Sequence, residues 1–205
     1  MKSLFKFSGF SNILCAILLI LSWFSIGIFM WNEISTQNFL TMVQNPAWMP
    51  VNVFYLLATI LLFPGIIALY IQQAEKIGNL GLTAFWITLL AIIWYTCIQF
   101  YETFFWPIIA SDSPLLFQAV GFSPTNNIIF AQLMLSAIPW TVGFILLGIV
   151  TSKTAFISRR IVYIFTLGAL LFGVGMLFPI RSLGVILFSY GLIKYGIALR
   201  RNFTS

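Results

Sequence analysis

The sequence predicts an all-α integral membrane protein, folded as one bundle of six transmembrane helices with both termini in the cytoplasm. The first observation is composition: of 205 residues, 61% are hydrophobic and 7% are charged, whereas a soluble domain carries about 25% charged residues. The second is that the apolar residues form runs of roughly 20, the length that a helix needs to cross a bilayer. The third is that most basic residues lie on one side of these runs. A soluble fold is therefore excluded.

The apolar runs follow one another with short segments between them. They are Phe10 to Trp31, Val51 to Ile71, Leu80 to Phe100, Asn127 to Val150, Arg160 to Phe178 and Leu183 to Leu199. The longest segments left over, 32–50 and 101–126, are too short to form a separate folded domain. One domain that covers residues 1–205 is therefore expected.

The first run also has features of a secretory signal peptide, because Lys2 and Lys6 precede an apolar core. Its length argues against cleavage, since the run passes about 20 residues. It ends in large side chains at 29–31 with no small-x-small site. Lipidation of Cys15 is disfavoured as well, because the apolar core follows the cysteine. A retained helix is expected.

The basic residues predict the orientation, since Lys and Arg in short loops stay on the cytoplasmic side of a membrane. The cations on the common side are Lys2, Lys6, Lys76, Lys153, Arg159, Arg160, Arg200 and Arg201. The opposite side receives Arg181, together with Glu33 and Asp112, and Glu102 lies at the edge of the third run. Both termini are therefore expected in the cytoplasm.

The net charge of +6 raises the question of nucleic-acid binding. The charges are spread over four membrane-proximal segments instead of one face. Membrane lipids with anionic head groups are therefore the expected partners, and nucleic acid is not.

Glycines are concentrated in the last two runs, where they let helix backbones approach closely. They are Gly168, Gly173, Gly175, Gly184, Gly191 and Gly196. Ala169 and Gly173 add a small-xxx-small pair. The pattern predicts a tightly packed hairpin of the fifth and sixth helices. Whether the same surface also makes a homo-oligomer or binds another membrane protein stays open.

The chain has few of the side chains from which catalytic and metal sites are usually built. It has no histidine, 4 acidic residues and 2 cysteines, and it lacks a glycine-rich phosphate loop. Cys15 and Cys97 are expected at different depths, too far apart for a disulfide. We therefore expect no metal site, no cofactor and no enzymatic activity.

Lys194 lies inside the last run, where an ionisable residue is a functional candidate because its burial is costly. It is six residues from Arg200, so its long side chain is expected to reach the cytoplasmic head groups. A Schiff-base lysine of the retinal type is the alternative, and six helices instead of seven argue against it.

Aromatic residues are expected at the membrane interfaces, as in an aromatic belt. Trp31, Trp48 and Trp106 flank the predicted outer ends of the runs, and Tyr70 and Tyr195 lie towards the inner ends.

Glu102 is the most informative polar residue. Gln99, Glu102 and Thr103 are spaced by three and four residues, so they lie on one helix face. Asn52, Gln132 and Arg181 are expected at a similar depth, so a polar patch can assemble at the outer membrane surface.

Two interpretations of this patch stay open. In one, Glu102 lies in the wetted interface or forms an ion pair with Arg181. In the other, Glu102 lines a ligand-binding mouth with Gln99, Asn52 and Gln132.

A weak internal repeat involves two prolines. Asn52 to Pro64 and Asn127 to Pro139 have the same spacing, and each pair opens a run from outside to inside. A proline removes a backbone hydrogen bond and bends a helix, and matched interruptions in two halves indicate a transport or ligand site. Trp140, beside Pro139, is then expected as an aromatic wall. The alternative is that prolines are simply tolerated in membrane helices.

A family resemblance covers nearly the whole chain. It rests on the segment 46–50 (PAWMP), on 101–104 (YETF) before Trp106 and Pro107, and on 158–160 (SRR) before a glycine-rich helix. The chain resembles small bacterial multi-pass membrane proteins of the domain-of-unknown-function type. Such proteins often have a histidine soon after the proline-rich segment, where this sequence has Asn52. The resemblance implies a bacterial cytoplasmic (inner) membrane location and supplies no activity.

The expected function follows from these observations. The sequence predicts a non-enzymatic protein that binds or passes a small hydrophobic or amphipathic molecule through a cavity in the outer leaflet. A structural or accessory subunit of a larger membrane complex is the alternative, since glycine-rich faces and short loops suffice for it. A membrane-embedded enzyme would depend on Glu102 as its acid or base.

Overall fold

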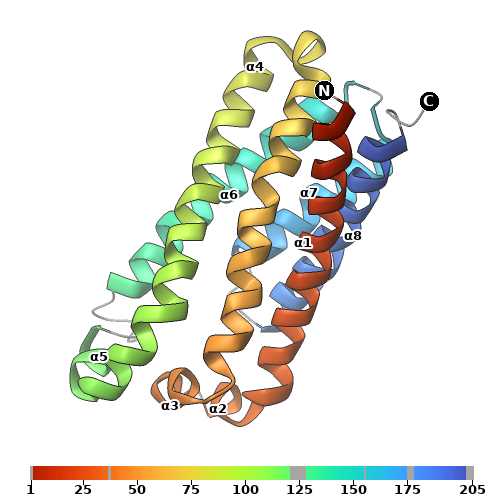
Figure 1. Cartoon of the computed structure of the whole chain (residues 1–205). Helices are drawn as coiled ribbons and strands as arrows, with labels where there is room; N and C mark the ends of the chain where they lie inside the picture. The colour runs from red at the N-terminus through yellow and green to blue at the C-terminus, as the bar shows by residue number, and fades with distance from the viewer. Residues whose placement is uncertain (1, 37, 121–127, 155, 175–177, 202–205) are drawn as a thin grey trace.

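A computed structural model describes residues 2–36, 38–120, 128–154, 156–174 and 178–201. These residues form helices joined by short turns, without a strand among them (Figure 1). The predicted all-α class is therefore confirmed.

The helices differ widely in length. They are α1 (Lys2–Phe29), α2 (Trp31–Ser35), α3 (Phe39–Gln44), α4 (Trp48–Asp112), α5 (Pro114–Val120), α6 (Ile128–Thr151), α7 (Arg159–Val174) and α8 (Phe178–Arg201). In the described part, α1, α4 and the segment Ile180–Arg201 of α8 are long and apolar enough to cross a membrane, and Leu135–Thr151 of α6 is a shorter apolar helix.

Helix α4 consists of two antiparallel arms that meet at Gly78 (Figure 1). Gly78 has φ 55° and ψ −156°, a backbone conformation that side-chain-bearing residues rarely adopt. Contacts between the arms define their register: the Trp48 Nε1–H donates to the Glu102 carbonyl at 3.0 Å, and the hydroxyls of Tyr55 and Tyr95 are 2.8 Å apart. The predicted second and third runs are therefore the two arms of one hairpin.

The long helices pack as a ring. Helix α1 contacts α4 and α8, α8 contacts α7, α7 contacts α6, and α6 contacts α4. The start of α1, the turn at Gly78, the connection from α6 to α7 and the end of α8 lie at one end, which we call the Gly78 end (Figure 1). Helices α2, α3 and α5 lie at the opposite end, the α5 end. The segments that carry the predicted cytoplasmic cations therefore gather at one end of the bundle.

The predicted close packing of the last two helices is confirmed. A Cβ atom added at Gly168 would lie 2.2 Å from the backbone nitrogen of Phe188, and one added at Gly184 would lie 2.4 Å from that of Phe172. Gly196 has a similar role against α1, since its added Cβ would lie 2.5 Å from the carbonyl oxygen of Gly9. These glycines are thus used for packing within the chain itself.

The segments left over between the predicted runs are largely helical. Helices α2 and α3 occupy much of 32–50, and the second arm of α4 continues to Asp112, well past the predicted end at Phe100. The reason is a cluster of apolar side chains at the α5 end that these helices bury together, which we call the aromatic cap. Its members are the buried residues Met30, Val43, Trp48, Trp106, Ala110 and Phe117, together with the half-buried Phe39 that packs against them.

The aromatic cap corrects part of the predicted belt. Trp48 and Trp106 are only 5% and 3% exposed, because their rings stack on each other and Phe39 meets both edge-on. Trp31 is 57% exposed, as an interfacial tryptophan would be.

Several helix ends differ from the predicted runs. Helix α1 begins at Lys2, and α8 begins at Phe178, which places Arg181 in the first turn of α8 instead of in a turn before it. Gly175 and Asn127, and with Asn127 one half of the repeat, lie outside the described residues.

The two predicted kink prolines lie inside continuous helices, Pro64 in α4 and Pro139 in α6. Gly78 is the interior position of α4 with non-helical backbone angles. Neither proline therefore breaks its helix, and the bends stay a prediction.

Candidate functional site

Polar side chains gather between the two arms of α4, towards the α5 end of the bundle. We call them the polar cluster, and they are Asn52, Tyr55, Tyr95, Gln99, Glu102, Thr103 and Arg181. Arg181 is half-buried, and the others are buried. Buried polar groups of this kind are rare in a membrane bundle and are functional candidates.

Helical spacing on each arm builds the polar cluster. Asn52 and Tyr55 lie one turn apart on the first arm, and Tyr95, Gln99 and Glu102 follow at intervals of four and three on the second. Because the arms are antiparallel and meet face to face, these two polar stripes contact each other.

Glu102 points into the bundle. Its Oε2 atom accepts a hydrogen bond from Gln99 Nε2 at 2.7 Å, and its side chain is 8% exposed. The Oε1 atom of Gln99 is buried and has no hydrogen-bond partner among the residues that the structure describes. The predicted neighbours Gln99 and Glu102 are therefore in direct contact, and one polar atom of the pair remains unsatisfied.

Asn52 contributes to the polar cluster through its backbone. Its Nδ2 atom donates to the carbonyl of Trp48 at 2.9 Å, one turn back on its own helix. The backbone carbonyl oxygen of Asn52 lies 3.4 Å from Thr103 Oγ1. That hydroxyl donates mainly to the backbone carbonyl of Gln99, at 2.6 Å. The structure thus brings Asn52 beside the second arm without a contact to the Glu102 carboxylate.

Two further predicted residues lie on α6. The Trp140 ring centroid is 5.1 Å from that of Tyr95 and 5.3 Å from that of Phe172, and Trp140 Nε1 donates to the carbonyl of Ala169 at 3.1 Å. Trp140 therefore forms a wall of the polar cluster. The side chain of Gln132 lies outside the part that the structure describes.

Arg181 is held by aromatic residues from three other helices. Its Nη2 atom donates to the hydroxyl of Tyr95 at 2.5 Å and to that of Tyr55 at 3.3 Å. Its Cζ atom is 5.0 Å from the ring centroids of Trp23 and of Phe172. The guanidinium thus lies between two rings, an arrangement that stabilises a cation.

The predicted ion pair of Glu102 with Arg181 is not formed as a direct contact. The Glu102 carboxylate bonds Gln99 within its own helix, whereas the guanidinium bonds the two tyrosine hydroxyls. The physical reason is the position of Arg181 in the first turn of α8, from which its side chain enters between Trp23 and Phe172.

Sequence reasoning missed the aromatic residues that bind Arg181. Tyr95 precedes Gln99 by one helical turn and continues the stripe of Glu102, so the same spacing argument could have found it. Trp23 lies in the middle of an apolar run and carries no such signal. Its role is visible only in the structure, where its Nε1 donates to Ser182 Oγ at 2.8 Å.

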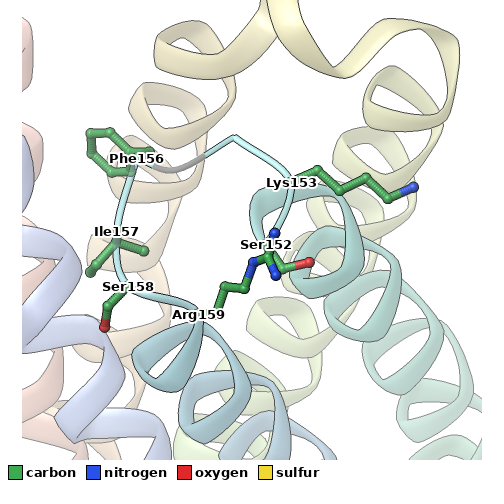
Figure 2. Close-up of a pocket in the computed structure, with 6 residues that line it drawn as sticks. All are labelled: Ser152, Lys153, Phe156, Ile157, Ser158 and Arg159. Atoms are coloured by element: carbon green, nitrogen blue, oxygen red, sulfur yellow. The ribbon is translucent and has the colours of Figure 1, made fainter.

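A hollow of different character lies at the Gly78 end (Figure 2). Its volume is about 380 Å³, and it is lined by Ser152, Lys153, Phe156, Ile157, Ser158 and Arg159. The Arg159 side chain extends towards Ser152, and Lys153 points away from the hollow (Figure 2). The connection that forms this hollow is fastened to α4 by a hydrogen bond of 2.9 Å from Thr154 Oγ1 to Gln73 Oε1.

The remaining candidates carry little chemistry. Among the described residues, no three His, Cys, Asp or Glu side chains gather where they could hold a metal ion. Cys15 is buried, Cys97 is exposed, and both are free thiols. Lys194 Nζ lies 5.4 Å from the ring centroid of Tyr190, one turn away on its own helix.

No family model matches the chain, and no match to it was found among curated proteins or solved structures. The function must therefore be argued from the residues of the polar cluster.

Proposed function

We propose that this protein crosses a bacterial cytoplasmic membrane six times, with both termini in the cytoplasm, and binds or passes a small amphipathic molecule in the outer half of its helix bundle. The binding site is the polar cluster. The role is non-enzymatic.

The distribution of charge supports this orientation. The exposed cations Lys153, Arg159, Arg160, Arg200 and Arg201 lie at the Gly78 end. A cytoplasmic location of this end obeys the positive-inside rule. The α5 end then faces outwards, and the polar cluster lies in the outer half of the membrane.

The observation that carries the binding role is unmet hydrogen-bonding capacity inside the polar cluster. Buried polar atoms in proteins are nearly always paired, yet Gln99 Oε1 and Arg181 Nε are buried and have no hydrogen-bond partner in the described part of the chain. Tyr95 and Phe172 contact the guanidinium of Arg181, and the Trp140 ring packs on both of them. Polar atoms that can still bond, beside aromatic walls, are what recognition of an amphipathic molecule requires.

An enzyme is a poorer fit to the same residues. Glu102 is engaged by Gln99 and does not contact another titratable side chain in the described part of the chain. General acid–base catalysis needs such a group within reach of a proton on the substrate, usually with a second group to orient it.

The accessory-subunit alternative was suggested by glycine-rich faces and short loops. Of the glycines, Gly168, Gly184 and Gly196 are packed against backbone atoms of the chain's own helices. Those surfaces are therefore not free to bind a partner.

Native mass spectrometry of the purified full-length chain tests the binding role. A small molecule retained by the parent protein and lost from Glu102→Gln, which keeps the shape of the side chain, is the expected result. A protein partner in stoichiometric amount without a retained small molecule would favour the accessory subunit and overturn the proposal.

Reporter fusions test the orientation independently. A reporter after Arg201 and one inserted between Val150 and Arg160 should both be active in the cytoplasm. A periplasmic signal at either site would contradict the six-span topology.

A further inference from the structure

The guanidinium of Arg181 has no acidic hydrogen-bond partner among the described residues, and Glu102 acts on it electrostatically without direct contact. The chain has 4 acidic residues, Glu33, Glu75, Glu102 and Asp112. All of them are described, and none contacts Arg181, whose hydrogen bonds go to Tyr55 and Tyr95. A charge removed from water is normally paired by direct contact, so the unbonded donors of Arg181 can still bind an anion in addition to the attraction from Glu102.

The remaining donors of Arg181 are suitably placed for an anion. The hydrogen bonds to the two tyrosines both come from Nη2. Nε is buried and unpaired, and no partner of Nη1 is found among the described residues. A guanidinium presents its N–H donors in one plane, and this geometry matches the oxygens of a carboxylate or a phosphate.

The position of the guanidinium is fixed before a ligand arrives. Trp23 and Phe172 lie against it, each with a ring centroid 5.0 Å from Cζ. The Tyr55 and Tyr95 hydroxyls hold Nη2 and are themselves 2.8 Å apart. A side chain held on several sides loses little rotamer freedom on binding, which favours affinity.

Arg181 can also be reached from the lipid. It is half-buried, and its neighbours Ile180 and Leu183 on α8 are 41% and 49% exposed. A molecule with an apolar tail can therefore keep the tail along this exposed surface of α8 while its head group reaches Arg181.

We infer that Arg181, positioned by Tyr55 and Tyr95, binds the anionic head group, a carboxylate or a phosphate, of an amphipathic molecule. This inference rests on the proposed function, because it names the head-group chemistry recognised at that same site. The two sources of this chemistry are a free amphipathic acid and an anionic phospholipid of the bilayer.

Quenching of tryptophan fluorescence by brominated lipids tests the inference, because Trp23 lies beside the guanidinium. The full chain is purified in a neutral detergent at physiological salt and titrated with three probes. These are a brominated palmitic acid, its methyl ester and a brominated phosphatidylglycerol. The acid is expected to bind saturably and at least about tenfold more tightly than the ester, as charge-assisted hydrogen bonds imply.

Variants assign this preference to Arg181. Arg181→Gln should make the acid and the ester bind alike, whereas Arg159→Gln, with the same change of net charge, should leave the preference intact. Arg181→Lys keeps the charge but loses the planar guanidinium, so it should retain part of the preference. It replaces Arg181→Gln as the test variant if Arg181→Gln does not fold. Persistence of the full preference in Arg181→Gln would overturn the inference.

The failure of the inference is distinguishable from that of the proposed function. Saturable binding of acid and ester with equal affinity would retain the proposed function and overturn the anionic head group. Absence of saturable binding for all three probes would overturn both. If phosphatidylglycerol binds more tightly than the acid and this binding depends on Arg181, the source of the head group is a phospholipid. If the acid binds more tightly, the source is a free acid.

Discussion

Arginines at the two ends of the bundle occupy similar helix positions in opposite surroundings. Arg159 is the first residue of α7, and Arg181 lies in the first turn of α8, where the helix dipole disfavours a cation at either site. Arg159 is exposed on the rim of an open hollow. Arg181 is held by two tyrosine hydroxyls and two aromatic rings. The first is an exposed charge, and the second is held inside the bundle, where we propose that it binds a head group.

The largest difference in stability is expected between the variants that neutralise Arg181 and Arg159. Arg181→Gln removes charge-assisted hydrogen bonds and ring contacts, so we expect it to lower the free energy of unfolding by about 2–3 kcal/mol. Arg159→Gln should stay within about 0.5 kcal/mol of the parent protein. Unfolding in mixed micelles, followed by circular dichroism, measures both. Equal losses at the two sites would remove the distinction between them.

The tyrosines sharpen the comparison further. Tyr95→Phe deletes the hydroxyl that bonds Arg181 at 2.5 Å, and we expect a loss of about 1.5 kcal/mol. Combined with Arg181→Gln, it should be non-additive by about 1 kcal/mol, as contacting residues are. Tyr163→Phe is a suitable control, because Tyr163 is 60% exposed. Additivity of Tyr95→Phe with Arg181→Gln would contradict the contact.

The double-mutant cycle of Glu102→Gln with Arg181→Gln should give a smaller coupling than the cycle with Tyr95. The two charged groups do not touch in the structure, so we expect a coupling energy below about 1 kcal/mol. If Glu102→Gln instead regained several kcal/mol of the stability lost in Arg181→Gln, as expected for a broken buried pair, the ion pair that the sequence suggested would be supported. Thermal denaturation of the parent, both single variants and the double variant provides the cycle.

The smallest effect is expected at the Gly78 end. Thr154→Val removes the hydrogen bond to Gln73 that fastens the rim of the hollow, and we expect a loss of about 1 kcal/mol or less. Hydrogen exchange should become faster in residues 152–158 and stay unchanged around Tyr95. A change in exchange around Tyr95 would show that the two ends are coupled.

The sequence predicted the long helices of this fold better than it predicted their ends. Apolar runs locate the two arms of α4, because a helix that crosses a bilayer needs an apolar run of roughly 20 residues. They do not extend to Asp112, since the helix beyond Phe100 is stabilised by Trp106 and Ala110 packing on distant segments. Contacts between residues far apart in the chain leave no periodic signal at either partner.

The candidate site was predicted in part for the same reason. Gln99 and Glu102 share a helix face, so their contact follows from spacing alone. The contacts of Arg181 do not follow from spacing. Its partners Tyr55, Tyr95 and Trp23 belong to other helices, and their approach depends on how the helices pack into a ring. Charge complementarity suggested Glu102 for Arg181, and the tertiary structure provides tyrosines as the direct contacts while Glu102 acts electrostatically without contact.

The contact of α1 with α8 has a consequence for how the protein is made. On the ribosome, α1 is synthesised before the other described helices and α8 after them, yet Gly9 packs on Gly196 and Trp23 bonds Ser182. Helix α1 must therefore wait for α8, with the first arm of α4 as its early neighbour through Asn12 against Gly65. The proposed head-group site around Arg181 is assembled only when α8 arrives and packs on α1. A ribosome stalled before α8 would leave the preceding described helices without the residue on which the proposed site is centred.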